Sequence, residues 1–97
     1  MGKYVLIYKG GKMADTQEER DQTMAAWGAW FGTLGESVVE AGAPFGGSTS
    51  VGNGGVSGLG GYSVITAGSL DDAASKVGAC PILAAGGSVE VYEELEM

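Results

Sequence analysis

The sequence predicts an α+β fold with four strands and two helices in a single domain, residues 1–97. Short apolar segments with strand character open and close the chain. Two segments with helical spacing of apolar residues lie between them, separated by a glycine-rich stretch and a further strand segment. The predicted order is β-α-β-β-α-β. This order is typical of a ferredoxin-like arrangement, a four-stranded antiparallel sheet with two helices on one face.

The first strand is predicted at Lys3–Lys9, which is rich in β-branched and aromatic residues and is followed by glycines. Tyr4, Leu6 and Tyr8 alternate with Val5 and Ile7, so the two sets point to opposite faces of the strand. Both sets are apolar. We therefore expect both faces of this strand to be covered.

The first helix is predicted to begin near Asp15 or Thr16, each of which has a glutamate three residues later. We expect it to run to about Ala41 and to end at Gly42. Its apolar residues recur at steps of three and four and form one stripe, with Trp30 at its margin. The stripe consists of Met24, Trp27, Phe31, Leu34, Val38 and Ala41.

Three glycines, Gly28, Gly32 and Gly35, share a neighbouring face of this predicted helix. Each costs about 1 kcal/mol relative to alanine inside a helix. One interpretation is that a second helix or a partner approaches the backbone closely there. The other is that the apolar stripe holds the helix and the glycines have no special role.

The glycine-rich stretch before the third strand raises the question of phosphate binding. A phosphate-binding loop needs glycines at set spacing and a helix directly after them. Here Ser57 stands where the third glycine would fall, and the strand segment Leu59–Thr66 follows. We therefore predict a hairpin between strands Phe45–Val51 and Leu59–Thr66. Its turn lies at Asn53-Gly54 or is longer and includes Gly55 and Gly58.

The second helix is predicted to begin at Ser69, which with Asp72 forms a capping pattern, and to end at Pro81. The residues Ser88–Glu93 alternate and predict the last strand. The tail Glu94–Met97 is acidic, and we expect little order in it. The apolar face of the second helix consists of Leu70, Ala73, Ala74 and Val77.

The net charge and the cysteine content restrict the partners and the cellular compartment that we expect for the protein. Twelve acidic residues against five basic ones give a net charge of −7. This charge argues against nucleic acid and against an anionic membrane surface as partners. Cys80 is the single cysteine, so we expect a reduced, cytoplasmic protein in which Cys80 is a small buried residue.

The sequence contains no histidine, which excludes Ser-His-Asp and Cys-His catalysis as well as histidine-bearing metal sites. We predict no cofactor, no metal site and no catalytic residue. The candidates for a small-molecule pocket are Trp27, Trp30, Tyr8, Tyr62 and Glu90. Such side chains are also common in cores and interfaces, and Trp27 suits the core especially.

Several segments together resemble the YCII-related family, nearly from end to end. They are Lys3–Tyr8, Trp27–Phe31, Gly61–Ile65, Ser69–Ala73, and Cys80–Leu83 followed by Gly86–Val91. The resemblance implies a dimeric α+β barrel in which two ferredoxin-like subunits place their sheets back to back. Some relatives are thought to be enzymes that use a histidine and an aspartate. This chain lacks the histidine and also the Asp-Gly-Pro-Phe segment of one large branch.

Three functions follow from these observations. The first is a homodimeric protein that binds a small apolar or aromatic molecule without catalysis. The second is a cofactor-independent lyase or oxygenase that uses a tyrosine, such as Tyr62, or a carboxylate, such as Glu90. The third is a non-catalytic subunit whose acidic surface meets a basic partner.

Overall fold

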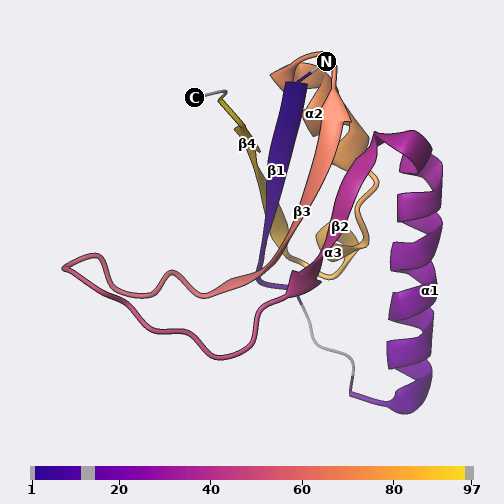
Figure 1. The fold of residues 1–97 in the computed structure, drawn as a ribbon. Helices are drawn as coiled ribbons and strands as arrows, with labels where there is room; N and C mark the ends of the chain where they lie inside the picture. The colour runs from indigo at the N-terminus through magenta and orange to yellow at the C-terminus, as the bar shows by residue number, and fades with distance from the viewer. Residues whose placement is uncertain (1, 12–14, 96–97) are drawn as a thin grey trace.

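The structure is a computed structural model that describes residues 2–11 and 15–95. Its four strands form one antiparallel sheet in the order β2-β3-β1-β4 (Figure 1). This order confirms the predicted α+β, ferredoxin-like sheet. The elements are β1 (Gly2–Lys9), α1 (Gln17–Leu34), a 3-10 turn (Gly35–Ser37), β2 (Val38–Pro44), β3 (Leu59–Ala67), α2 (Leu70–Val77), α3 (Pro81–Ala84) and β4 (Ser88–Glu93).

The core lies on one face of the sheet, where β1 and β3 contribute every second residue. On β1, Tyr4, Leu6 and Tyr8 are buried, as their alternation predicts. The helices α2 and α3 cover this face with Ala73, Val77 and Ile82, together with Cys80, the capping residue just before α3. The opposite face carries Val5 and Ile7, which are half-buried, and no helix of the described chain covers it. We call this second face the open face.

The helix α1 begins where the capping pattern at Thr16 predicts. The Glu19 backbone N–H donates to Thr16 Oγ1 over 3.1 Å, and the Asp15 backbone N–H donates to the Glu19 carboxylate over 2.9 Å. These bonds satisfy donors that the first helical turn leaves free. Their pattern selects Thr16, rather than Asp15, as the capping residue.

The predicted end of the first helix at Ala41 is wrong, because α1 ends at Leu34. Gly35 follows with a φ of +54°, and its N–H bonds the Phe31 carbonyl. The residues Val38 and Ala41, which prolong the apolar spacing, belong to β2 instead. Met24, at the other end of the predicted stripe, is 73% exposed.

The second strand is therefore β2 (Val38–Pro44), and the prediction of a strand at Phe45–Val51 is wrong. Residues 45–58 form a long connection without strand pairing, which extends away from the sheet (Figure 1). Positive φ angles occur at Gly52, Gly55 and Gly58 rather than at Asn53 and Gly54. The two-residue turn is therefore wrong, and the connection is longer, as the alternative with Gly55 and Gly58 allows. A strand, β3, does follow the glycines, as the rejection of a phosphate-binding loop requires.

The helix α2 is capped as predicted: Ser69 Oγ accepts the Asp72 backbone N–H over 3.0 Å. It ends at Val77 rather than at Pro81, and Pro81 begins the short helix α3. Proline suits that place because the first helical position needs no N–H. Only Ala73 and Val77 of its predicted apolar face are buried.

Two glycines provide a stability test of these packing relations. A Cβ at Gly28 would meet no atom within 4 Å, whereas a Cβ at Gly42 would lie 1.8 Å from the Tyr62 carbonyl oxygen, at a φ of +77°. We expect Gly28→Ala to stabilise the protein by up to about 1 kcal/mol. Gly42→Ala should destabilise it by about 2 kcal/mol or more. Urea denaturation of both variants measures the difference, and a marked loss of stability in Gly28→Ala would mean that a further element packs closely on that helix face.

Candidate functional site

The helix α1 touches the rest of the molecule mainly through large side chains. Trp30 is its one buried residue, and Trp27, Phe31 and Leu34 are partly buried against the core. The residues between them on the helix include several alanines and glycines, which do not fill the space beside the rings. Two pockets therefore lie along α1.

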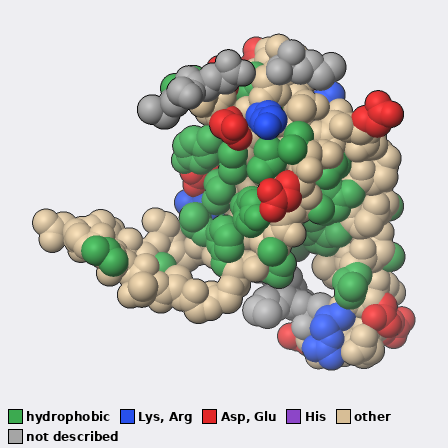
Figure 2. Space-filling view, viewed as in Figure 1, with side chains coloured by type: hydrophobic (Ala, Val, Ile, Leu, Met, Phe, Trp, Pro, Cys, Tyr) green, Lys and Arg blue, Asp and Glu red, His purple; other side chains and the backbone are tan. Residues whose placement is uncertain are grey.

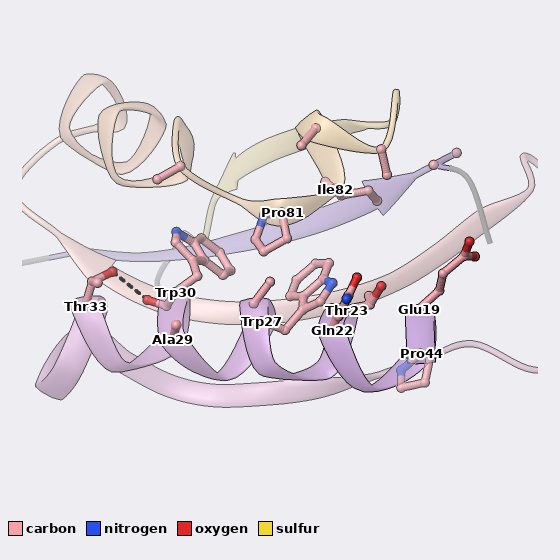
Figure 3. Close-up of a pocket in the computed structure, with 16 residues that line it drawn as sticks. Glu19, Gln22, Thr23, Trp27, Ala29, Trp30, Thr33, Pro44, Pro81 and Ile82 are labelled. Carbon is pink, nitrogen blue, oxygen red and sulfur yellow. Dashed lines mark hydrogen bonds between the residues drawn. The ribbon is translucent and has the colours of Figure 1, made fainter. Parts of the chain in front are cut away.

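The larger pocket, about 1070 Å³, lies between α1 and the segment that contains α3. Figure 3 shows Trp27 and Trp30 extending from α1 toward Pro81 and Ile82. Polar side chains from the first half of α1 line one end of it, namely Glu19, Gln22 and Thr23. This pocket is broad and contains no cluster of buried polar groups that would orient a ligand.

The smaller pocket, about 550 Å³, lies between α1 and the strands β1, β2 and β3. Met24, Trp27 and Phe31 line it from the helix, while Tyr8 and Ser63 line it from the sheet. Its size is within the range of about 300–1,000 Å³ that is common for small-molecule sites. An apolar, aromatic wall and the hydroxyl groups of Tyr8 and Ser63 are thus brought together in one partly open pocket.

Aromatic rings connect the helix to the sheet at this pocket. The Tyr8 and Trp27 rings are 5.0 Å apart and nearly perpendicular, and the Trp27 and Trp30 rings are 5.8 Å apart in a similar geometry. Phe31 lies 5.0 Å from Trp30. The pairs that Trp27 makes with Tyr8 and Trp30 are edge-to-face, an arrangement that is favourable beyond the apolar area that it buries. Trp27 is shared by both pockets.

Trp30 anchors α1 to the rest of the core. It is 4% exposed, and its indole N–H donates to the Lys76 carbonyl on α2 over 3.2 Å. Trp30 therefore belongs to the core rather than to the margin of the apolar stripe. Trp27, which the spacing favours as the core residue, is only partly buried.

A chain of hydrogen bonds crosses the sheet beneath the helix. The Tyr8 hydroxyl donates to Ser63 Oγ over 2.7 Å, and the Ser63 hydroxyl donates to the Ala41 carbonyl over 2.6 Å. These residues belong to β1, β3 and β2, and all three line the smaller pocket. Burial raises the pKa of Tyr8 to about 12, although its bond to Ser63 acts in the opposite direction. Tyr8 is therefore neutral at physiological pH.

The described residues also bear on three further features, namely a metal site, a reactive thiol and a membrane-spanning helix. Among them, no three His, Cys, Asp or Glu side chains gather in a way that could hold a metal ion. The thiol of Cys80 is buried, as predicted, and burial raises its pKa. None of the described helices is both long and apolar enough to cross a membrane.

A comparison with protein-family models matches residues 3–97 to the YCII-related domain. The chain belongs to the YCII-related family. No curated protein matches it. This match confirms the family resemblance seen in the sequence, and it covers nearly the whole chain.

This YCII-related chain places the predicted pocket residues in two separate regions. Tyr8 lines the smaller pocket, Trp30 lines the larger one, and Trp27 lines both. Tyr62 borders the smaller pocket, but its hydroxyl donates to Glu40 Oε1 over 2.6 Å at an exposed position. Glu90 lines neither pocket, because β4 presents it on the open face, in register with Ile7.

Sequence reasoning missed Ser63 and the Ala41 carbonyl. Ser63 is fully buried, and it alternates with the buried residues Ile65 and Ala67 along β3. A hydroxyl in the buried phase of a strand indicates a polar partner, because a buried hydroxyl needs a hydrogen bond. That signal was present in the sequence. The position of Ala41 was not, because it depends on the true place of β2.

Charged groups on the open face of the YCII-related chain form a small network. The Tyr92 hydroxyl donates to Glu90 Oε1, and Lys9 Nζ lies 2.9 Å from Glu90 Oε2. These two contacts lower the pKa of Glu90 below its ordinary value of 4.5, while Glu90 raises the pKa of Lys9 above 10.5. The pair therefore stabilises the fold between these two pH values and is lost as the pH falls through the folded pKa of Glu90.

We expect Glu90→Gln to lower stability slightly at neutral pH, because the Lys9 pair is exposed and weak. The difference from the wild type should shrink as the pH falls below 4.5 and disappear once the pH lies below the lowered pKa of folded Glu90, where the carboxylate is protonated. It should also shrink in about 1 M salt. Chemical denaturation across pH tests this, and a difference that persists in acid would contradict the ion-pair explanation.

Proposed function

We propose that this YCII-related protein binds a small apolar or aromatic molecule in the smaller pocket and that it works as a homodimer. The observation that carries the proposal is the pocket of about 550 Å³ lined by Tyr8, Trp27 and Phe31. Ligand sites of this kind are mostly apolar, with a few polar groups that orient the molecule. The hydrogen-bonded hydroxyls of Tyr8 and Ser63 are the polar groups of this pocket.

Binding fits the titratable groups better than acid–base catalysis does. An effective general acid or base has a pKa near the working pH. Burial raises the pKa of Tyr8, and the bond to Glu40 raises the pKa of Tyr62. Contacts with Tyr92 and Lys9 lower the pKa of Glu90. Each shift moves the group away from titration at neutral pH.

The open face of the sheet supports the homodimer. Val5, Ile7 and Val64 are half-buried there, and Tyr92 is exposed. Figure 2 shows hydrophobic side chains gathered over the strands, with a few acidic and basic ones among them. Lys9 and Glu90 neutralise each other on this face, so two acidic chains can approach through it. Two sheets packed face to face would cover the apolar residues of each.

A matched pair of substitutions tests the ligand site. Met24 lines only the smaller pocket and Thr23 only the larger one; both are exposed neighbours on α1. We expect phenolic or quinone compounds to change tryptophan fluorescence, because Trp27 lines the pocket. Met24→Glu should weaken their binding about tenfold by placing a charge in the apolar wall.

The control for that experiment is Thr23→Glu, which changes the net charge equally and should leave affinity within about twofold. Equal weakening by both variants would place the ligand elsewhere or show a general charge effect. No fluorescence response from any compound, in a folded sample, would overturn the proposed binding function.

A charged residue introduced on the open face tests the proposed dimer. We expect Ile7→Glu to convert a dimer into a monomer in sedimentation velocity, because Ile7 lies near the centre of that face. Ala25→Glu on the exposed side of α1 is the charge-matched control and should remain dimeric. Stable dimers bury about 800 Å² per partner, out of the 6512 Å² exposed by this chain. A wild-type monomer at micromolar concentration would contradict the proposal.

A further inference from the structure

The hydrogen-bond chain of the smaller pocket has only one direction in which it can run. The Ala41 carbonyl has no proton and can only accept. Ser63 has one hydroxyl proton, and its Oγ lies 2.6 Å from that carbonyl, so this proton is used there. Ser63 Oγ must therefore accept from Tyr8, which lies 2.7 Å away and has one proton of its own.

The direction of the chain determines what Tyr8 can offer to a ligand. Its single proton is committed to Ser63, so the remaining capacity of its oxygen is the lone pairs. Tyr8 lines the pocket, and Trp27 packs against its ring at 5.0 Å. Because the Tyr8 pKa lies at about 12, the hydroxyl keeps this proton throughout the physiological range.

We infer that the smaller pocket selects aromatic molecules that carry a hydrogen-bond donor, such as a phenolic hydroxyl, and that Tyr8 Oη accepts this donor. The inference rests on the proposed function and adds the chemical class of the ligand. Trp27 and Phe31 line the pocket together with Tyr8. An aromatic ring placed against the first two side chains would therefore direct its donor group to Tyr8. A ligand that carries only acceptors leaves Tyr8 Oη unpaired or faces its lone pairs directly.

The test compares 2-naphthol with its methyl ether, 2-methoxynaphthalene, which has the same ring but no donor. Wild-type protein should bind 2-naphthol about fivefold more tightly, the size expected for one net hydrogen bond. In Ser63→Ala the Tyr8 proton is released from its acceptor and becomes free to donate. The preference for 2-naphthol should then fall toward one.

Tyr4→Phe is the matched control for Tyr8→Phe. Both tyrosines are buried on the same face of β1, but Tyr4 does not line the smaller pocket. Tyr8→Phe should reduce the preference for 2-naphthol, and Tyr4→Phe should keep it. If wild-type protein binds both compounds equally, the inference fails while the proposed function stands. If it binds neither compound, the proposed function fails and the inference with it.

Ser63→Ala leaves a buried carbonyl without its donor, so this variant can fail to fold. A further measurement therefore uses the wild-type protein alone. Neutron diffraction of deuterated wild-type crystals locates the hydroxyl deuterons of Tyr8 and Ser63. The inference requires the Tyr8 deuteron on the line to Ser63 Oγ. A Tyr8 deuteron directed into the pocket would overturn it.

Discussion

The two tryptophans of α1 determine how far this helix lies from the sheet. Trp30 is buried and bonds the Lys76 carbonyl, and Trp27 meets Tyr8 edge to face. Large rings at these positions prevent close contact, while the small residues around them leave space unfilled. The pockets on both sides of Trp27 are the consequence. A helix with leucines at evenly spaced positions would instead close onto the sheet, so the site depends on the uneven distribution of side-chain size along α1.

Most strands of the sheet were predictable because their signals are local. The strands β1, β3 and β4 each show apolar or alternating segments bounded by glycine or serine, and their boundaries differ from the prediction by one residue at most. The end of α1 was not predictable from periodicity. Val38 and Ala41 continue the steps of three and four by coincidence, even though Gly35 has already ended the helix. Because the predicted helix included the residues of β2, the second strand was predicted too late in the chain, at Phe45–Val51, where the structure has an extended connection.

The candidate site shows the same division between local and long-range information. Aromatic side chains near a helix–sheet contact are visible in the sequence, and Tyr8 and Trp27 were predicted on that basis. The partner of Ser63 is a backbone carbonyl on β2, and a carbonyl has no sequence signature. It becomes a partner only when antiparallel pairing places Ala41 beside β3. A correct boundary for β2 was therefore a precondition for finding the polar part of the pocket.

The alternation of β3 links the pocket to the proposed dimer. Ser63 points to the covered face and holds Ala41, while Tyr62 points to the open face and holds Glu40. Both bonds tie the same edge strand, β2, to β3 from opposite sides of the sheet. Gly42, the residue after Ala41, passes against the Tyr62 carbonyl, where a Cβ would not fit. A partner subunit that pressed on the open face would contact Tyr62 and Glu40 and thereby restrain β2. Because β2 carries the carbonyl that orients Ser63 and Tyr8, such restraint would also hold the acceptor in place for a ligand. Dimer formation and ligand recognition would then both depend on how β2 is held against β3.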